Sequence, residues 1–159
     1  MLYVFKKGLD KKFEIVGERM ENIRHIIIPV DDTEDSKNAV KEGAFFAKLL
    51  GVDVKIITVN DTHQFMSSVI LEEKLKQETS AFLDGFKKIA EEFGVNTETE
   101  LIIGNPAEEI VKYVNENDLI IMAYHEKNKG IDKIMEKSVS RDVVSNAPCD
   151  VLVIKSKNY

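Results

Sequence analysis

The sequence predicts an α/β domain of three layers: an open sheet of five mainly parallel strands with helices on both faces. From Ile23 onward, short runs of β-branched and other apolar residues alternate with amphipathic stretches long enough for helices. After its first residue, the run Asp118–Ala123 is apolar throughout, which is typical of a strand buried on both faces of a parallel sheet. A chain of 159 residues suits one such domain with a sizeable core.

The first half of this pattern contains two strands and two helices. HIIIPVD, residues 25–31, predicts a strand that is ended by a proline and two aspartates. Residues 33–50 have apolar side chains at helical spacing, and Gly51 is placed to stop that helix. VDVKIITVN, residues 52–60, predicts the second strand. A long helix is expected from about Ser67 to Phe93, with Leu71 among its apolar face and Gly94 at its end.

The second half continues with three strands and two helices. TETELIIG, residues 97–104, predicts the third strand. Asn105, Pro106 and Glu108 then form the clearest helix start in the chain, with a cap, a proline at the first position and a capping box. After the fourth strand, a helix is expected to start near Ser138 and to stop before Pro148. DVLVIK, residues 150–155, predicts the fifth strand.

The first 22 residues lie outside this alternation. LYVF and FEIV flank KKGLDKK, so they predict a hairpin with Gly8 in its turn, or else a loosely attached terminal arm. We therefore divide the chain into an N-terminal extension, residues 1–22, and one domain, residues 23–159.

Composition excludes several classes of function. A formal net charge of −6 argues against a general nucleic-acid binder, which needs a basic face. No apolar run approaches the roughly 20 residues of a membrane span, and the lysine-broken start shows no signal peptide. The single cysteine, Cys149, excludes an internal disulfide and fits a small buried hydrophobe better than a redox centre. We expect a cytoplasmic protein without a membrane or nucleic-acid partner.

Three segments, in order and at the right spacing, carry a resemblance to a known family. They are IRHIIIPVDDTEDSKNAVKEGAFFAKLLGVDVKIITVND, GNPAEEIVKYVNENDLIIMAYH and SVSRDVVSNAPCDVLVIK. Together they resemble the universal stress protein family, with its Pro-Val-Asp strand end, its Gly-Asn/Asp-Pro-Ala helix start and its Ala-Pro-Cys close. The resemblance runs from about Ile23 to Lys155.

The resemblance implies the strand order 3-2-1-4-5. Strands 1 and 4 are then neighbours whose connections leave in opposite directions, and their carboxyl ends form the crevice where open α/β sheets bind ligands. The last strand would lie at an edge, and an apolar edge tends to pair with another chain. Because the corresponding strands form a dimer seam in this family, we expect a homodimer through Val151, Leu152, Val153 and Ile154.

In ATP-binding members of the family, the loop after strand 4 resembles Gly-x-x-Gly, nine residues, then Gly-Ser/Thr. Transferred to this chain, Ala123, Glu126 and Lys137 occupy the three glycine positions, the last if the loop has one extra residue. Asp31 matches the adenine-side aspartate, Val59 the strand-2 valine, and Gly130 a later glycine of the loop. The candidate nucleotide-binding residues are Pro29, Asp31, Val59, Met122, Ala123, His125, Gly130, Ser138 and Val139.

Loss of the glycines predicts a degenerate ATP loop. Glycine lets the backbone amides approach phosphates closely, and a carboxylate such as Glu126 about 4 Å from a phosphate costs on the order of 4 kcal/mol. We therefore interpret the chain as a dimeric stress-response protein that acts by binding and not by catalysis, with no cofactor assigned. The alternative is a regulatory module in which Lys127, Lys129 and Lys137 help to hold ATP or AMP, with Mg²⁺. A slow ATPase is a further alternative.

Several residues that could take part in chemistry also have a purely structural explanation. Asp31 and Asp32 are candidates for Mg²⁺ ligands, but aspartates after a strand more often cap a helix or form a turn, and we expect one of the pair to be a cap. His63 and His125 have no arranged carboxylate beside them, so no metal site is predicted. Ser138 lacks a nucleophile-elbow motif, and capping of the next helix accounts for its place.

Overall fold

The computed structural model describes residues 20–61, 69–124 and 136–155. Its strands and helices alternate along the chain as the sequence predicts. The elements are β1 (His25–Pro29), α2 (Glu34–Leu50), β2 (Asp53–Asn60), α3 (Val69–Glu91), β3 (Thr97–Ile103), α4 (Pro106–Tyr113), β4 (Asp118–Tyr124), α5 (Glu136–Asn146) and β5 (Asp150–Lys155). The N-terminal hairpin or arm falls on residues 1–19, outside the described residues, and stays a prediction.

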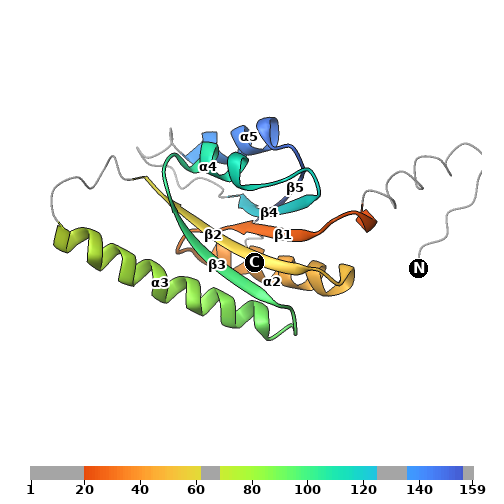
Figure 1. Ribbon diagram of the computed structural model, residues 1–159, viewed down its shortest axis with the longest axis horizontal. Coiled ribbons are helices and arrows are strands. Elements are labelled where there is room, and N and C mark those ends of the chain that lie inside the picture. Colours follow the sequence, from red (N-terminus) through yellow and green to blue (C-terminus); the bar gives the residue numbers. More distant parts are fainter. Residues whose placement is uncertain (1–19, 62–68, 125–135, 156–159) are drawn as a thin grey trace, which may run out of the picture.

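The five strands form one sheet in the order β3-β2-β1-β4-β5 (Figure 1). Every pairing in it is parallel, so the predicted strand order is confirmed. β1 lies in the centre, with His25 opposite Asp53 of β2 and Asp118 of β4. Because β2 and β4 lie on opposite sides of β1, the connections diverge at the carboxyl ends of β1 and β4.

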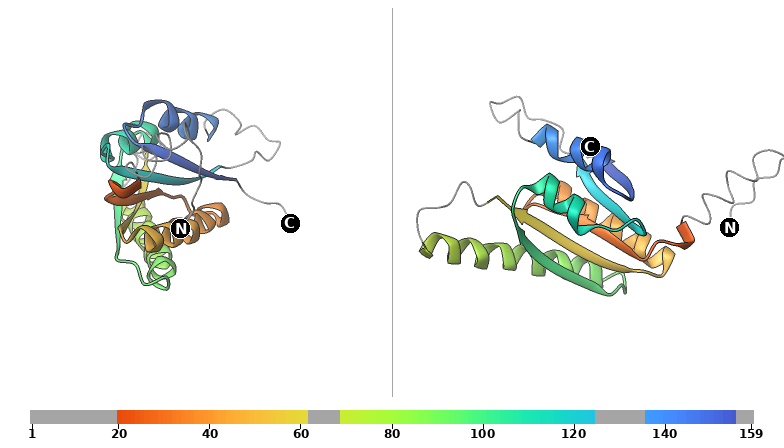
Figure 2. Two further views of the ribbon diagram at one scale, coloured as in Figure 1. Left: turned by 90° about the vertical axis from the view of Figure 1, so that its right-hand side faces the viewer. Right: turned by 45° about the horizontal axis from the view of Figure 1, so that its top comes forward.

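Two apolar cores lie between the sheet and its helices. α2 and α3 cover one face, and α4 and α5 cover the other (Figure 2). Successive residues of β1 point into different cores. Ile26 and Ile28 belong to the core under α2 and α3, and Ile27 belongs to the core under α4 and α5. This alternation follows from the two-residue period of a strand and explains why β1 is apolar on three successive residues, Ile26 to Ile28.

Gly43 lets α2 lie close to the central strand. A Cβ atom added at this position would overlap Cδ1 of Ile28, a side chain with no exposed surface. The left-handed residue Gly51, with φ 67°, ends the helix as predicted. The helix therefore packs directly on β1, the strand whose carboxyl end carries several of the candidate residues.

The predicted cap of α4 is confirmed, and that of α5 is wrong. Asn105 Oδ1 accepts a hydrogen bond from the backbone N–H of Glu108, and Pro106 is the first helical residue. α5, however, begins at Glu136, so Ser138 lies inside the helix and does not cap it.

The start of α3 differs from the expected amphipathic helix. Leu71, predicted on the apolar face, is half exposed, and Val69 and Ile70 are more than 80% exposed. The first turns of this helix extend beyond the strands (Figure 1), so the sheet does not cover them.

Within the described ranges, no helix combines the length and the apolar character needed to cross a bilayer.

Cys149 is half-buried and packs against the core under α4 and α5. Burial, reinforced by the nearby charge of Asp118, raises the pKa of the Cys149 thiol to about 11. The thiol is therefore protonated at neutral pH, where nucleophilic chemistry would need a thiolate. This environment agrees with the structural role predicted for the residue.

Candidate functional site

A cavity of about 210 Å³ opens where β1 and β4 end, at the predicted crevice. Because all five strands are parallel, their carboxyl ends lie at this same end of the sheet. Six of the nine candidate residues line the cavity. They are Pro29, Asp31, Val59, Met122, Ala123 and Val139. Residues from three strands and from α5, distant in sequence, therefore meet at one place.

Of the remaining three candidates, only Ser138 belongs to the residues that the structure describes. His125 and Gly130 lie outside the described residues, as do His63, Glu126 and the lysines of the loop up to Lys133. Ser138 is described only as part of the α5 backbone. Its neighbours Val139 and Ser140 line the cavity, so the first turns of α5 lie beside it.

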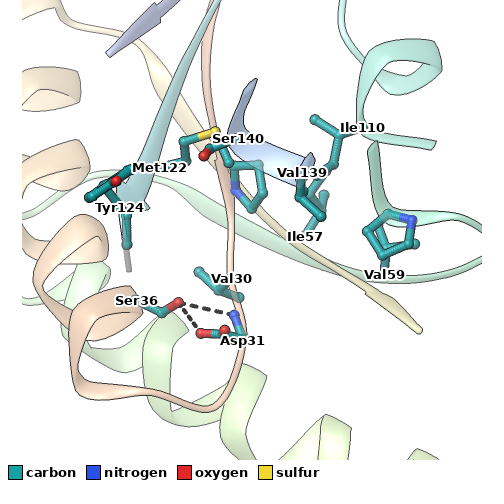
Figure 3. Close-up of a pocket in the computed structure, with 13 residues that line it drawn as sticks. Val30, Asp31, Ser36, Ile57, Val59, Ile110, Met122, Tyr124, Val139 and Ser140 are labelled. Carbon is teal, nitrogen blue, oxygen red and sulfur yellow. Dashed lines mark hydrogen bonds between the residues drawn. The ribbon is translucent and has the colours of Figure 1, made fainter. Parts of the chain in front are cut away.

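Asp31 is held by two hydroxyl groups from the start of α2. Its Oδ1 atom accepts a hydrogen bond from Ser36 Oγ at 2.6 Å and another from Thr33 Oγ1 at 2.5 Å. The backbone N–H of Asp31 donates to Ser36 Oγ at 3.0 Å (Figure 3). The carboxylate thus lies at the wall of the cavity in an orientation that α2 determines.

The cap of α2 is Thr33, so the prediction that Asp31 or Asp32 caps a helix is wrong. Thr33 Oγ1 accepts a hydrogen bond from the backbone N–H of Ser36. β1 ends at Pro29 and the helix begins at Glu34, which makes Thr33 the last residue before the helix. Asp31 has the alternative role considered for it, that of a turn residue, since it accepts from side chains two and five residues later.

Sequence reasoning missed seven residues of the cavity wall. They are Val30, Ser36, Ile57, Pro106, Ile110, Tyr124 and Ser140. Some of them carried a usable signal, because Ile57 lies two residues before Val59 on the same face of β2, and Ile110 lies one helical turn after Pro106. Ser36 carried none, since its contact with Asp31 depends on the geometry of the turn between β1 and α2.

The walls of the cavity combine apolar side chains with a few polar groups. Ile57, Val59 and Ile110 lie on one side, while Asp31 and Ser36 lie across from Val139 and Ser140 (Figure 3). Apolar walls suit a flat ring system, and a carboxylate accepts hydrogen bonds from ligand N–H or O–H groups. Such an arrangement is suited to a small ligand with one apolar, ring-like part and hydrogen-bond donors at its edge.

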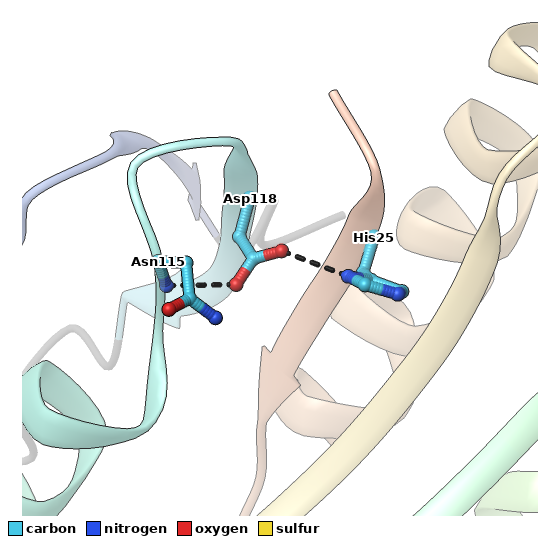
Figure 4. Close-up of polar contacts among 3 residues, drawn as sticks. All are labelled: His25, Asn115 and Asp118. Atoms are coloured by element: carbon cyan, nitrogen blue, oxygen red, sulfur yellow. Dashed lines mark hydrogen bonds and ion pairs between the residues drawn. The ribbon is translucent and has the colours of Figure 1, made fainter. Parts of the chain in front are cut away.

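A second polar cluster lies at the amino ends of the strands, at the other end of the sheet from the cavity. Asp118, whose side chain is 4% exposed, places Oδ1 3.0 Å from His25 Nδ1 and accepts a hydrogen bond from the backbone N–H of Asn115 through Oδ2 (Figure 4). These contacts tie the first residue of β1 to the first residue of β4 and to the turn before it. This cluster therefore holds together the two strands whose other ends form the cavity.

The described residues include no group of three His, Cys, Asp or Glu side chains arranged to hold a metal ion.

Comparison with known proteins identifies relatives of this chain. Residues 22–155 match the universal stress protein family. A universal stress protein of Methanocaldococcus jannaschii is 38% identical over 144 residues, which cover 85% of this chain and 84% of that protein.

Solved structures give the same fold. The universal stress protein from Archaeoglobus fulgidus in complex with dAMP has a TM-score of 0.61 at 23% identity, and the comparison covers 84% of this chain and 98% of that one. A universal stress family protein from Arabidopsis thaliana with AMP bound has a TM-score of 0.57 at 18% identity, covering 84% and 92%. With the match over residues 22–155, these findings confirm the resemblance in the sequence: the chain belongs to the universal stress protein family.

Proposed function

We propose that this protein binds an adenine nucleotide in the cavity between β1 and β4, and that occupancy, not turnover, carries its role in a stress response. The observation on which the proposal rests is the meeting of Asp31, Val59, Ala123 and Val139 around one cavity at the switch point of the sheet. The relatives from Archaeoglobus fulgidus and Arabidopsis thaliana, solved with dAMP and AMP, support the same ligand class.

The described part of the cavity suits the adenosine end of such a ligand. Its volume of about 210 Å³ is below the roughly 300–1,000 Å³ of most ligand pockets, so it has room for a base and sugar better than for a whole triphosphate. Apolar side chains from β2 and α4 would lie against the base, and Asp31 would accept a hydrogen bond from it or from the ribose.

The phosphate end would lie toward α5 and the loop before it. The first turns of α5 border the cavity, and the N-terminal end of a helix favours an anion. By the family resemblance, Ala123, Glu126 and, if the loop has one extra residue, Lys137 stand where ATP-binding members have glycines, so the close approach of backbone amides to phosphates would be lost. We therefore propose that the β- and γ-phosphates add little to the affinity.

This proposal predicts that AMP and ATP bind with similar strength. In a calorimetric titration of nucleotide-stripped protein, we expect the two dissociation constants to agree within about threefold, which is less than about 1 kcal/mol. Titrations with and without Mg²⁺ show whether the ion contributes. Absence of binding by both nucleotides up to several millimolar would contradict the proposed function.

Two further measurements refine this test. Glu126→Gly removes the carboxylate and restores one glycine, so it should tighten ATP more than AMP if the adenosine end is intact. Incubation of the same protein with Mg-ATP, followed by measurement of released ADP, tests the slow-ATPase alternative.

We also propose that β5 forms the seam of a homodimer. β5 lies at an edge of the sheet, and its residues Val151, Leu152, Val153 and Ile154 are only partly buried within one chain. An apolar strand edge of this kind tends to pair with a second chain. Sedimentation velocity at micromolar concentration should give the mass of two chains, and the mass of one chain would refute the dimer.

A further inference from the structure

Ser36 stands out among the residues that line the cavity. It is 2% exposed, and its hydroxyl group makes two hydrogen bonds with one residue, Asp31. Ser36 Oγ accepts from the Asp31 N–H at 3.0 Å and donates to Asp31 Oδ1 at 2.6 Å. One hydroxyl therefore contacts both the backbone and the carboxylate of the same aspartate (Figure 3).

Thr33 completes this arrangement. Its hydroxyl donates to Asp31 Oδ1 while it accepts from the backbone N–H of Ser36. The three residues form a closed set of hydrogen bonds, because each is joined to the other two. Two donors that converge on one carboxylate oxygen restrict the rotation of the side chain, which is broad for a terminal sp³–sp² bond such as χ2 of aspartate.

The anchor of this set on the helix side is buried and closely packed. Ser36 lies in the first turn of α2, and α2 packs tightly on β1 where Gly43 meets Ile28. The orientation of the Asp31 carboxylate is thus set before any ligand arrives. Preorganisation of this kind increases affinity and selectivity because the ligand does not have to order the group that recognises it.

We propose that Ser36 is a positioning residue that gives the site its selectivity for nucleotides able to donate a hydrogen bond to Asp31. The inference rests on the proposed nucleotide function and names a determinant within the same site. Without the Ser36 hydroxyl, the carboxylate rotates more freely and recognises the donor less well. A ligand that lacks the donor loses little by the change.

The experiment compares three ligands on two proteins. AMP, 2′-deoxy-AMP and purine riboside monophosphate, which lacks the amino group of adenine, are titrated calorimetrically into the native protein and into Ser36→Ala. For the native protein we expect AMP to bind about 5- to 30-fold more tightly than whichever analogue lacks the donor that meets Asp31. For Ser36→Ala we expect this preference to fall below about threefold.

Thr97→Val is the matched control. Thr97 is also 2% exposed, and its hydroxyl group makes a hydrogen bond to the backbone oxygen of Val95, at the opposite edge of the sheet from the cavity. Like Ser36→Ala, the change removes a buried hydroxyl group and keeps most of the volume. It should leave the preference for AMP unchanged, whatever it does to the melting temperature.

The outcomes separate the two proposals. If the native protein binds none of the three nucleotides, the proposed function fails, and this inference fails with it. If the native protein prefers AMP and Ser36→Ala keeps the full preference, or if the native protein binds all three equally, only the positioning role is overturned. Should Ser36→Ala not fold, the near-isosteric Ser36→Cys, with its weak S–H donor, should show a reduced preference, and an unchanged one would overturn the role.

Discussion

Replacement of Asp31 by alanine is expected to weaken the binding of AMP by roughly 10- to 100-fold. The carboxylate lies at the cavity wall, and a hydrogen bond to a charged acceptor contributes roughly 1.5–3 kcal/mol. The variant also removes the acceptor for the Thr33 and Ser36 hydroxyls. Calorimetric titration gives the affinity, and thermal unfolding on the same sample shows whether the fold is intact.

Asp32→Ala provides the matched control for this change. Asp32 is the next residue, has the same charge and is exposed like Asp31, but it does not line the cavity. Its replacement should alter the affinity for AMP by less than about twofold. Equal affinity of Asp31→Ala and the native protein, with both folded, would show that the carboxylate does not contact the ligand.

Replacement of Asp118 by alanine is expected to lower the free energy of unfolding by roughly 2–3 kcal/mol. The side chain is 4% exposed and accepts from the Asn115 N–H at 2.8 Å, with His25 Nδ1 at 3.0 Å from its other oxygen (Figure 4). Both contacts join the starts of β1 and β4. Chemical denaturation with urea measures the change.

Asp53→Ala is the control, because this residue also lies at the amino ends of the strands. Asp53 begins β2 directly beside His25 in the sheet register but is exposed, so its replacement should change the stability by less than about 0.5 kcal/mol. If Asp118→Ala is no more destabilising than Asp53→Ala, the contacts among His25, Asp118 and Asn115 do not stabilise the fold.

Much of the fold follows from local signals in the sequence. Asn105 and Pro106 mark a helix start because each has one favoured position there, the cap and the first turn, and the structure places them so. Gly51 and Gly94 both have positive φ after a helix, as expected where only glycine is free of strain. The strand order came instead from the family resemblance, since local periodicity does not determine which strands are neighbours.

The turn after β1 shows where sequence reasoning reaches its limit. Asp31, Asp32 and Thr33 are three consecutive residues able to cap a helix, and the choice of Thr33 depends on where the strand stops. Ser36 then meets Asp31 through the path of that turn, which no residue pattern specifies. The cap of α5 was misplaced for a similar reason, because a lone serine is a weaker signal than Asn-Pro.

The cavity at the carboxyl ends of β1 and β4 is the site where we propose that the nucleotide binds. The most direct test is an ¹H–¹⁵N correlation spectrum of the labelled protein titrated with AMP. The proposal predicts shifts concentrated at the amides of Asp31, Val59, Ala123 and Val139, with those of His25 and Asp118 at the opposite edge unchanged. Shifts confined to other surfaces, or a spectrum unchanged at several millimolar AMP, would contradict it.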